Sequence, residues 1–172
     1  MRPPAQGPLA MKILAVVGAA AALAVAAPAF AQNAGQIASA RAGVNCAKCN
    51  LFQADFNGLN LSGKTFAGSR LRQADMSAAI MNRVNFAGAD LRDLNAFGTL
   101  FTGANLSGAD LTHASFVGAY LQGANLRGAR LEGANFAGAE MDRALGLTQA
   151  QLDRACGDET TQLPAGLRIP HC

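Results

Sequence analysis

The chain has 172 residues, a length that fits one domain, and its 14 basic and 11 acidic residues give a formal net charge of +3. Two of the basic residues, Arg2 and Lys12, lie within the first 31 residues, so the rest of the chain has a net charge of +1. A charge so close to zero gives no electrostatic case for nucleic-acid binding.

Residues 1–31 have the features of a secretory signal peptide. Lys12 precedes an apolar run over residues 13–27, and Ala29-Phe30-Ala31 forms a small-residue cleavage site. The run is shorter than the about 20 apolar residues of a membrane anchor. Residues 1–10 delay the charged region, which favours translation from Met11. We therefore expect export to the periplasm or the cell exterior, with no stable membrane anchor after cleavage and a mature chain that begins near Gln32.

The next segment, residues 32–45, has no periodicity and is predicted to form a flexible leader or a weak cover. From Leu51 to Met141, by contrast, an apolar residue recurs every five positions, and eighteen of these nineteen centres are Leu, Phe or Met. Neither a helix of period 3.6 nor a strand of period 2 keeps such a column on one side. A fixed internal period indicates stacked units that share one continuous core.

Each five-residue unit prefers particular residues around its centre. Ala usually comes two residues before the centre, Asn or Asp one residue before it, and Gly two residues after it. Alternate residues point to the same side, so Ala and the centre both enter the core. Asn and Asp accept backbone hydrogen bonds in turns, and Gly adopts angles that other residues resist. Each unit is therefore predicted to be a short extended piece followed by a corner.

This signature, A-(N/D)-L-x-G, resembles the pentapeptide-repeat family over about residues 49–145. The resemblance implies an all-β solenoid over residues 46–145, a right-handed four-sided β-helix with 20 residues per coil and just under five coils. At a strand spacing of about 4.8 Å, such a column would be roughly 23 Å tall.

On four-sided coils, residues 20 apart stack, and the outward side chains fall into columns. The face around Leu111 is strongly charged, and we name it the charged face. It contains Arg70, Arg72, Asp90, Arg92, Asp93, Asp110, His113, Arg130 and Glu132. Because both signs are interspersed, we interpret it as a self-neutralising surface. Recognition of an acidic or phosphorylated partner is the alternative.

On the opposite side, Ile80, Leu100 and Tyr120 replace the usual Asn or Asp on consecutive coils. Phe97 and Val117 lie beside them, just after the preceding centres. We name these five residues the apolar corner. A patch of about 400 Å² is at the size where exposure starts to have a functional meaning. It is predicted to be a dimer or partner interface. The alternatives are neutral drift in a tolerant repeat and cover by residues 32–44.

The periodicity fails after Met141, and residues 146–172 are predicted to cap the column. Thr148 and Gln151 form a capping box for a short helix that ends near Gly157. The apolar residues Ala150, Leu152 and Ala155 of this helix are expected to cover the open core.

Four cysteines lie at the two ends of the repeat: Cys46, Cys49, Cys156 and Cys172. An even number in an exported chain indicates disulfides. Three pairings are open, and proximity favours Cys46 with Cys49 and Cys156 with Cys172. The second pair closes a loop of about 16 residues, worth around 3 kcal/mol in the chain-entropy model.

The Cys46-Ala-Lys-Cys49 motif also leaves open a redox or metal-binding role. Covalent haem attachment would need His where Asn50 stands. A thioredoxin-like pair would need a strand before it and a helix after it, and the spacing of the second pair suits zinc poorly.

The sequence contains no catalytic triad, phosphate loop or metal-ligand cluster, so we expect no enzymatic activity, cofactor or metal. The leading hypothesis is an exported scaffold that binds an unknown protein partner or itself. A gyrase-binding DNA mimic of the same family is the alternative, but it would need an acidic cytoplasmic column.

Overall fold

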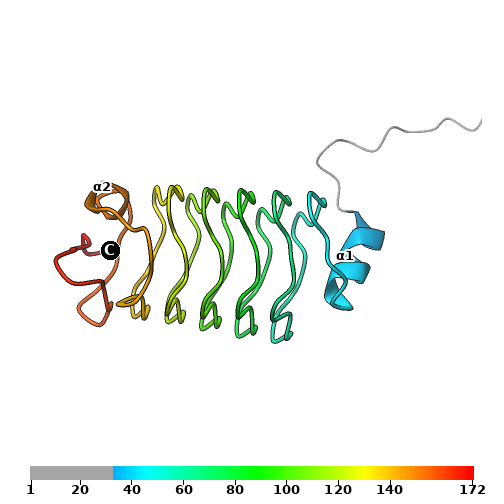
Figure 1. The fold of residues 1–172 in the computed structure, drawn as a ribbon, viewed down its shortest axis with the longest axis horizontal. Coiled ribbons are helices and arrows are strands. Elements are labelled where there is room, and N and C mark those ends of the chain that lie inside the picture. The colour runs from blue at the N-terminus through cyan, green and yellow to red at the C-terminus, as the bar shows by residue number, and fades with distance from the viewer. Residues whose placement is uncertain (1–32) are drawn as a thin grey trace, which may run out of the picture.

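The computed structural model describes residues 33–172, which form a column of stacked coils with one short helix at each end (Figure 1). Helix α1 spans Ala34–Arg41, and helix α2 spans Gln149–Leu152. Within the described residues, no helix is both long and apolar enough to span a membrane. The predicted signal peptide, its cleavage site and the alternative start at Met11 lie outside this part of the chain.

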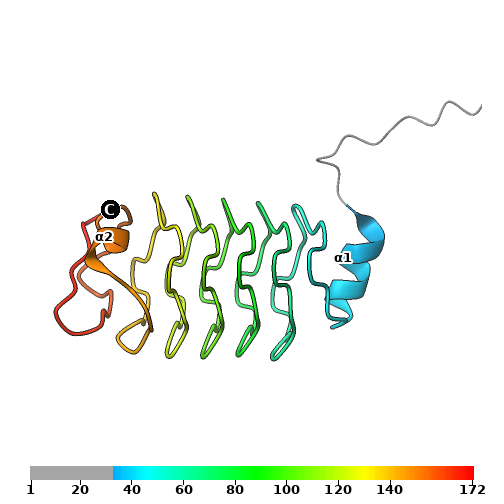
Figure 2. The same cartoon turned by 45° about the horizontal axis from the view of Figure 1, so that its top comes forward.

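The coils are joined by parallel bridges between residues that are 20 positions apart. Ile80 pairs with Leu100, and Leu100 pairs with Tyr120. The bridging residue of each unit directly precedes a buried centre, and the centre donates its own N–H to the next coil. For example, the Leu111 N–H donates to the Arg130 carbonyl at 2.8 Å. Four five-residue units thus make one repeat of the column. Figure 2 shows the coils stacked one upon another between α1 and α2.

The corners have the chemistry that the repeat predicts. The Asp110 carboxylate accepts a hydrogen bond from the Thr112 N–H at 3.1 Å, which fixes the chain as it enters the turn. Gly108 lies two residues after the centre Leu106. Its φ of +63° is in the left-handed region that favours glycine. At seven equivalent positions, residues with side chains adopt the same conformation: Lys48, Gln53, Gln73, Ala78, Arg83, Asp93 and His113.

The centres form one continuous core. The Leu column through Leu111 is at most 1% exposed. Six phenylalanine rings contact one another along the core, with neighbouring centroids 5.2–6.2 Å apart in stacked, tilted and edge-on pairs. At the single small centre, Ala96, the preceding Leu94 fills the core instead, and both residues are buried.

The prediction of a flexible leader is wrong, because residues 34–41 form the folded helix α1 over the first coil. Asn33 caps the helix by accepting the Gln36 N–H at 3.0 Å. The Gln36 side chain accepts the Asn50 N–H at 2.7 Å, and Ala40 is fully buried. Arg41 also forms an ion pair with Asp55 at 3.0 Å. These contacts, rather than intrinsic helix propensity, stabilise so short a helix.

At the other end, Thr148 and Gln151 form the predicted capping box of α2. Leu152 and Ala155 are buried as expected, but Ala150 is exposed and does not cover the core. The helix also ends earlier than predicted, at Leu152 with Asp153 as its C-cap, and Gly157 instead pairs with His171. A four-residue helix buries only one of its faces, so the segment after it completes the cap.

Candidate interaction surface

The apolar corner is built by two neighbouring columns of outward side chains. The bridges place Ile80, Leu100 and Tyr120 directly above one another on consecutive coils. Phe97 and Val117 form the second column, because the Gly98 N–H donates to the Val117 carbonyl at 2.9 Å. The structure therefore brings all five predicted residues together.

These side chains meet solvent to an unusual degree. Phe97 is 59% exposed and Tyr120 is 41% exposed, while the other three are half-buried. Only four large apolar residues are exposed within residues 33–172, and two of them belong to this corner. A contiguous apolar patch that stays exposed to solvent, outside the core, is typical of an interaction surface.

Helix α1 does not cover the apolar corner. Its side-chain contacts go to Asn50 and Asp55 on the first coil, and it lies across the end of the column (Figures 1 and 2). Cover by the described leader residues is therefore ruled out as an explanation for the patch.

The charged face is a chain of ion pairs. Arg92 binds Asp90 through two hydrogen bonds of 2.8 Å each, and this contact lowers the pKa of the Asp90 carboxyl below its ordinary value. Arg72 pairs with Asp93 at 3.1 Å, and Arg130 lies between Asp110 and Glu132 at 3.8 and 3.7 Å. This pairing supports the interpretation of a self-neutralising surface.

The two remaining members of the charged face lie against neighbouring groups. Arg70 lies over the Phe52 ring, 5.0 Å from its centroid. The His113 imidazole lies close over Gly133, where a Cβ atom would come within 2.5 Å of its Nδ1. Neither arrangement builds a catalytic or metal-binding set.

The CxxC motif forms a disulfide that is anchored to the next coil. Cys46 and Cys49 are joined with a Cα–Cα distance of 5.5 Å. The Ser69 hydroxyl donates to the Cys46 carbonyl at 2.6 Å and accepts the Cys49 N–H at 3.0 Å. Cys156 and Cys172 form the second bridge, so both favoured pairings are present. Within residues 33–172, no cluster of three or more potential metal ligands occurs.

Sequence reasoning missed two further exposed cations, Arg83 and Arg143. Each stands at a place where the repeat usually has Gly, and they are 60 residues apart. Only the 20-residue bridge spacing shows that they lie on the same side of the column. A search for charged residues at multiples of 20 would have found them.

The fold is thus a solenoid of stacked five-residue units with capped ends. The family model "Pentapeptide repeats" matches eight copies, over residues 49–88, 79–116, 89–128 and 114–156. The chain belongs to the pentapeptide repeat family. The parallel bridges between residues 20 apart agree with the β-solenoid class that the sequence predicts.

Solved structures of the same family are similar to the chain. A pentapeptide repeat protein from the Arabidopsis thaliana thylakoid lumen is 35% identical, with 48% of this chain and 68% of that chain covered and a TM-score of 0.36. A pentapeptide repeat protein from Nostoc PCC 7120 is 18% identical, with 80% of this chain and 89% of that chain covered and a TM-score of 0.33. QnrB1, a plasmid-mediated fluoroquinolone resistance protein, is 21% identical, with 69% of this chain and 76% of that chain covered and a TM-score of 0.35. A comparison with curated proteins gives no match.

Proposed function

We propose that this protein is a non-enzymatic exported scaffold that binds a partner protein through the apolar corner. The carrying observation is the exposure of Tyr120, in a column where the repeat normally places Asn or Asp, and of Phe97 in the neighbouring column. Aromatic residues are the commonest anchors of protein interfaces, because they bury a large area at a low cost in conformational entropy. Membership of a family of structural and interaction proteins supports the same reading.

Export rests on the signal-peptide features of residues 1–31, and the two disulfides agree with an oxidising compartment. The DNA-mimic alternative is less well supported. A DNA mimic needs an excess of acidic surface, whereas residues 32–172 have a net charge of +1 and the charged face pairs its carboxylates with arginines.

The test is affinity capture from the exported fraction with Leu100→Asp as the decisive variant. Asp occupies the same place in other units, at Asp75, Asp90 and Asp110, so the variant should fold normally. His113→Asp is the control, because it also introduces one negative charge on an outward side chain, but on the charged face.

The wild-type protein and His113→Asp should retain the same partner, and Leu100→Asp should weaken its binding by about tenfold or more. Sedimentation of the three proteins alone separates self-association from binding of a different chain. Unchanged partner capture and unchanged association by Leu100→Asp would contradict the proposal.

A further inference from the structure

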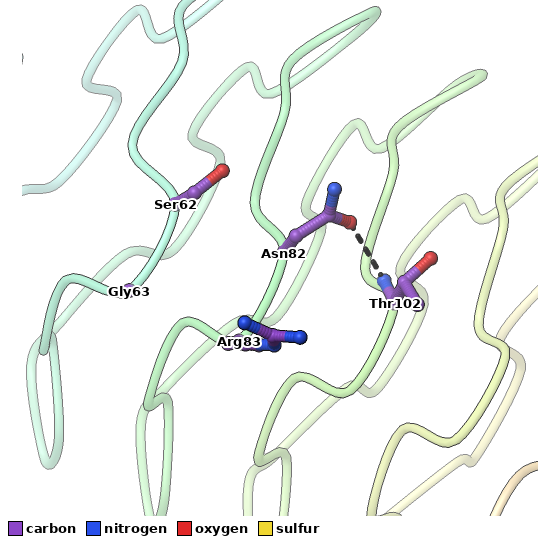
Figure 3. A pocket seen from close by; sticks show the side chains of 5 residues that line it. All are labelled: Ser62, Gly63, Asn82, Arg83 and Thr102. Carbon is purple, nitrogen blue, oxygen red and sulfur yellow. Dashed lines mark hydrogen bonds between the residues drawn. The ribbon is translucent and has the colours of Figure 1, made fainter.

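A shallow polar groove runs beside the apolar corner. It consists of two open hollows of about 400 and 410 Å³ that meet at Thr102. We name it the donor groove. The first hollow is lined by Ser62, Gly63, Asn82, Arg83 and Thr102 (Figure 3), and the second by Thr102, Gln122, Gly123, Arg143 and Leu145.

The groove and the corner are two edges of the same side of the column. Leu100 and Thr102 flank the buried centre Phe101, and both point outward because side chains alternate along an extended segment. The same spacing relates Ile80 to Asn82 on the preceding coil. An apolar stripe and a polar groove therefore run in parallel along the column.

The donor groove is cationic, and its arginines form no ion pairs within residues 33–172. No acidic residue lines either hollow. Arg83 and Arg143 are exposed, and neither takes part in an ion pair within residues 33–172, in contrast to the arginines of the charged face. Asp142, next to Arg143 in the chain, accepts a hydrogen bond from the Gln122 amide group and lines neither hollow.

Part of the backbone of the groove is occupied by hydrogen bonds between coils. The Arg83 N–H donates to the Thr102 carbonyl at 2.9 Å, and the Gly103 N–H donates to the Gln122 carbonyl at 2.8 Å. Side chains supply further donors. The Asn82 Oδ1 atom accepts the Thr102 N–H at 3.0 Å, as Figure 3 shows, which leaves the Asn82 NH₂ group as a donor.

The Gln122 amide group adds little to recognition. Its Nε2 atom already donates to Asp142, and its Oε1 atom is buried out of reach of a ligand. The donors left in the groove are the exposed Arg83 and Arg143 and the Asn82 NH₂ group. The groove therefore suits a ligand that carries negative charges, such as an acidic peptide segment.

We propose that the apolar corner and the donor groove together bind one extended segment of a partner protein, in which apolar and acidic residues alternate. The apolar side chains would lie on Leu100 and Tyr120, and the carboxylates would pair with Arg83 and Arg143. These arginines are three coils apart, about 14 Å at the strand spacing, which is about four residues of an extended chain. Four is an even number, so both carboxylates project from the same side of the bound segment.

This inference rests on the proposed function, because the apolar half of the surface is the apolar corner. Its probes are soluble synthetic peptides of about ten residues, a length that spans the groove. One has Leu alternating with Glu over its central stretch, a second has Leu with Lys, and a third has Ser with Glu. Fluorescence anisotropy measures the binding of each peptide to the purified full chain.

The Leu–Glu peptide should bind, and the Leu–Lys and Ser–Glu peptides should bind at least about tenfold more weakly. Arg83→Gln and Arg143→Gln should each weaken the Leu–Glu peptide by about three- to tenfold and flatten its dependence on salt. Arg127→Gln is the matched control, because Arg127 is exposed, lines neither hollow and carries the same charge. It should change nothing.

The results separate the two proposals. If Leu100→Asp abolishes peptide binding but the groove variants bind like wild type, the apolar corner stands and the groove inference fails. If the groove variants weaken binding and Leu100→Asp does not, the role of the apolar corner fails. Failure of the Leu–Glu peptide to bind, or equal binding of the Leu–Lys peptide, would overturn the inference.

Discussion

Truncation of one core leucine should destabilise the protein strongly. Leu111→Ala removes three methylene-sized groups from a side chain with 0% exposure, which costs about 2.4 kcal/mol at about 0.8 kcal/mol per group. The cavity should remain open, because the bridges from Asp110 to Asp90 and to Arg130 hold the coils on both sides. A persistent cavity of this size adds up to about 2 kcal/mol, so we expect a loss of about 4 kcal/mol.

Leu145→Ala is the matched control, since it makes the same chemical change at a leucine that is 57% exposed. Its cost should stay below about 1 kcal/mol. Equilibrium denaturation in urea, followed by circular dichroism, gives both values. Equal midpoints for the two variants would refute the assignment of the centres to the interior.

Four other predictions follow from single features. Gly108→Ala should destabilise the protein by about 1 kcal/mol, because its φ of +63° disfavours a side chain although the space around it is open. Thr160 and Gly138 donate hydrogen bonds to the Asp158 carboxylate and lower its pKa to about 2. The ionised carboxylate should therefore contribute its full stabilisation above about pH 4 and lose it as the pH falls through about 2. NMR titration of Asp158 measures this pKa. Peptide mapping of exported protein should find one disulfide at each end and no free thiol. N-terminal sequencing should find a start near Gln32.

Most of the column could be predicted because its information is local and repeated. Nineteen successive units follow the same pattern. The register therefore stays clear even at Ala96, where a small residue replaces the large apolar centre. The glycine place was equally predictable, since one backbone conformation recurs there even where His113 or Asp93 replaces glycine.

The ends and the groove could not be predicted for physical reasons. Helix α1 has no apolar stripe and depends on the docking of Ile37 and Ala40 against the first coil, a tertiary contact that periodicity does not reveal. Arg83 and Arg143 are far apart in the sequence, and their lack of ion-pair partners within residues 33–172 is a property of the folded surface. Local patterns specify this scaffold, whereas the proposed binding surface combines residues from several coils.

The most direct test of the central claim, that the apolar corner is the contact surface, is site-specific photo-crosslinking. A photoreactive amino acid would be placed at Tyr120 in one version of the protein and at His113, on the charged face, in another. Both positions are exposed, so the probe should be tolerated at each. In the producing cells, we expect a discrete crosslinked product from position 120 and none from position 113. A product of equal yield from both positions, or one from position 113 alone, would contradict it.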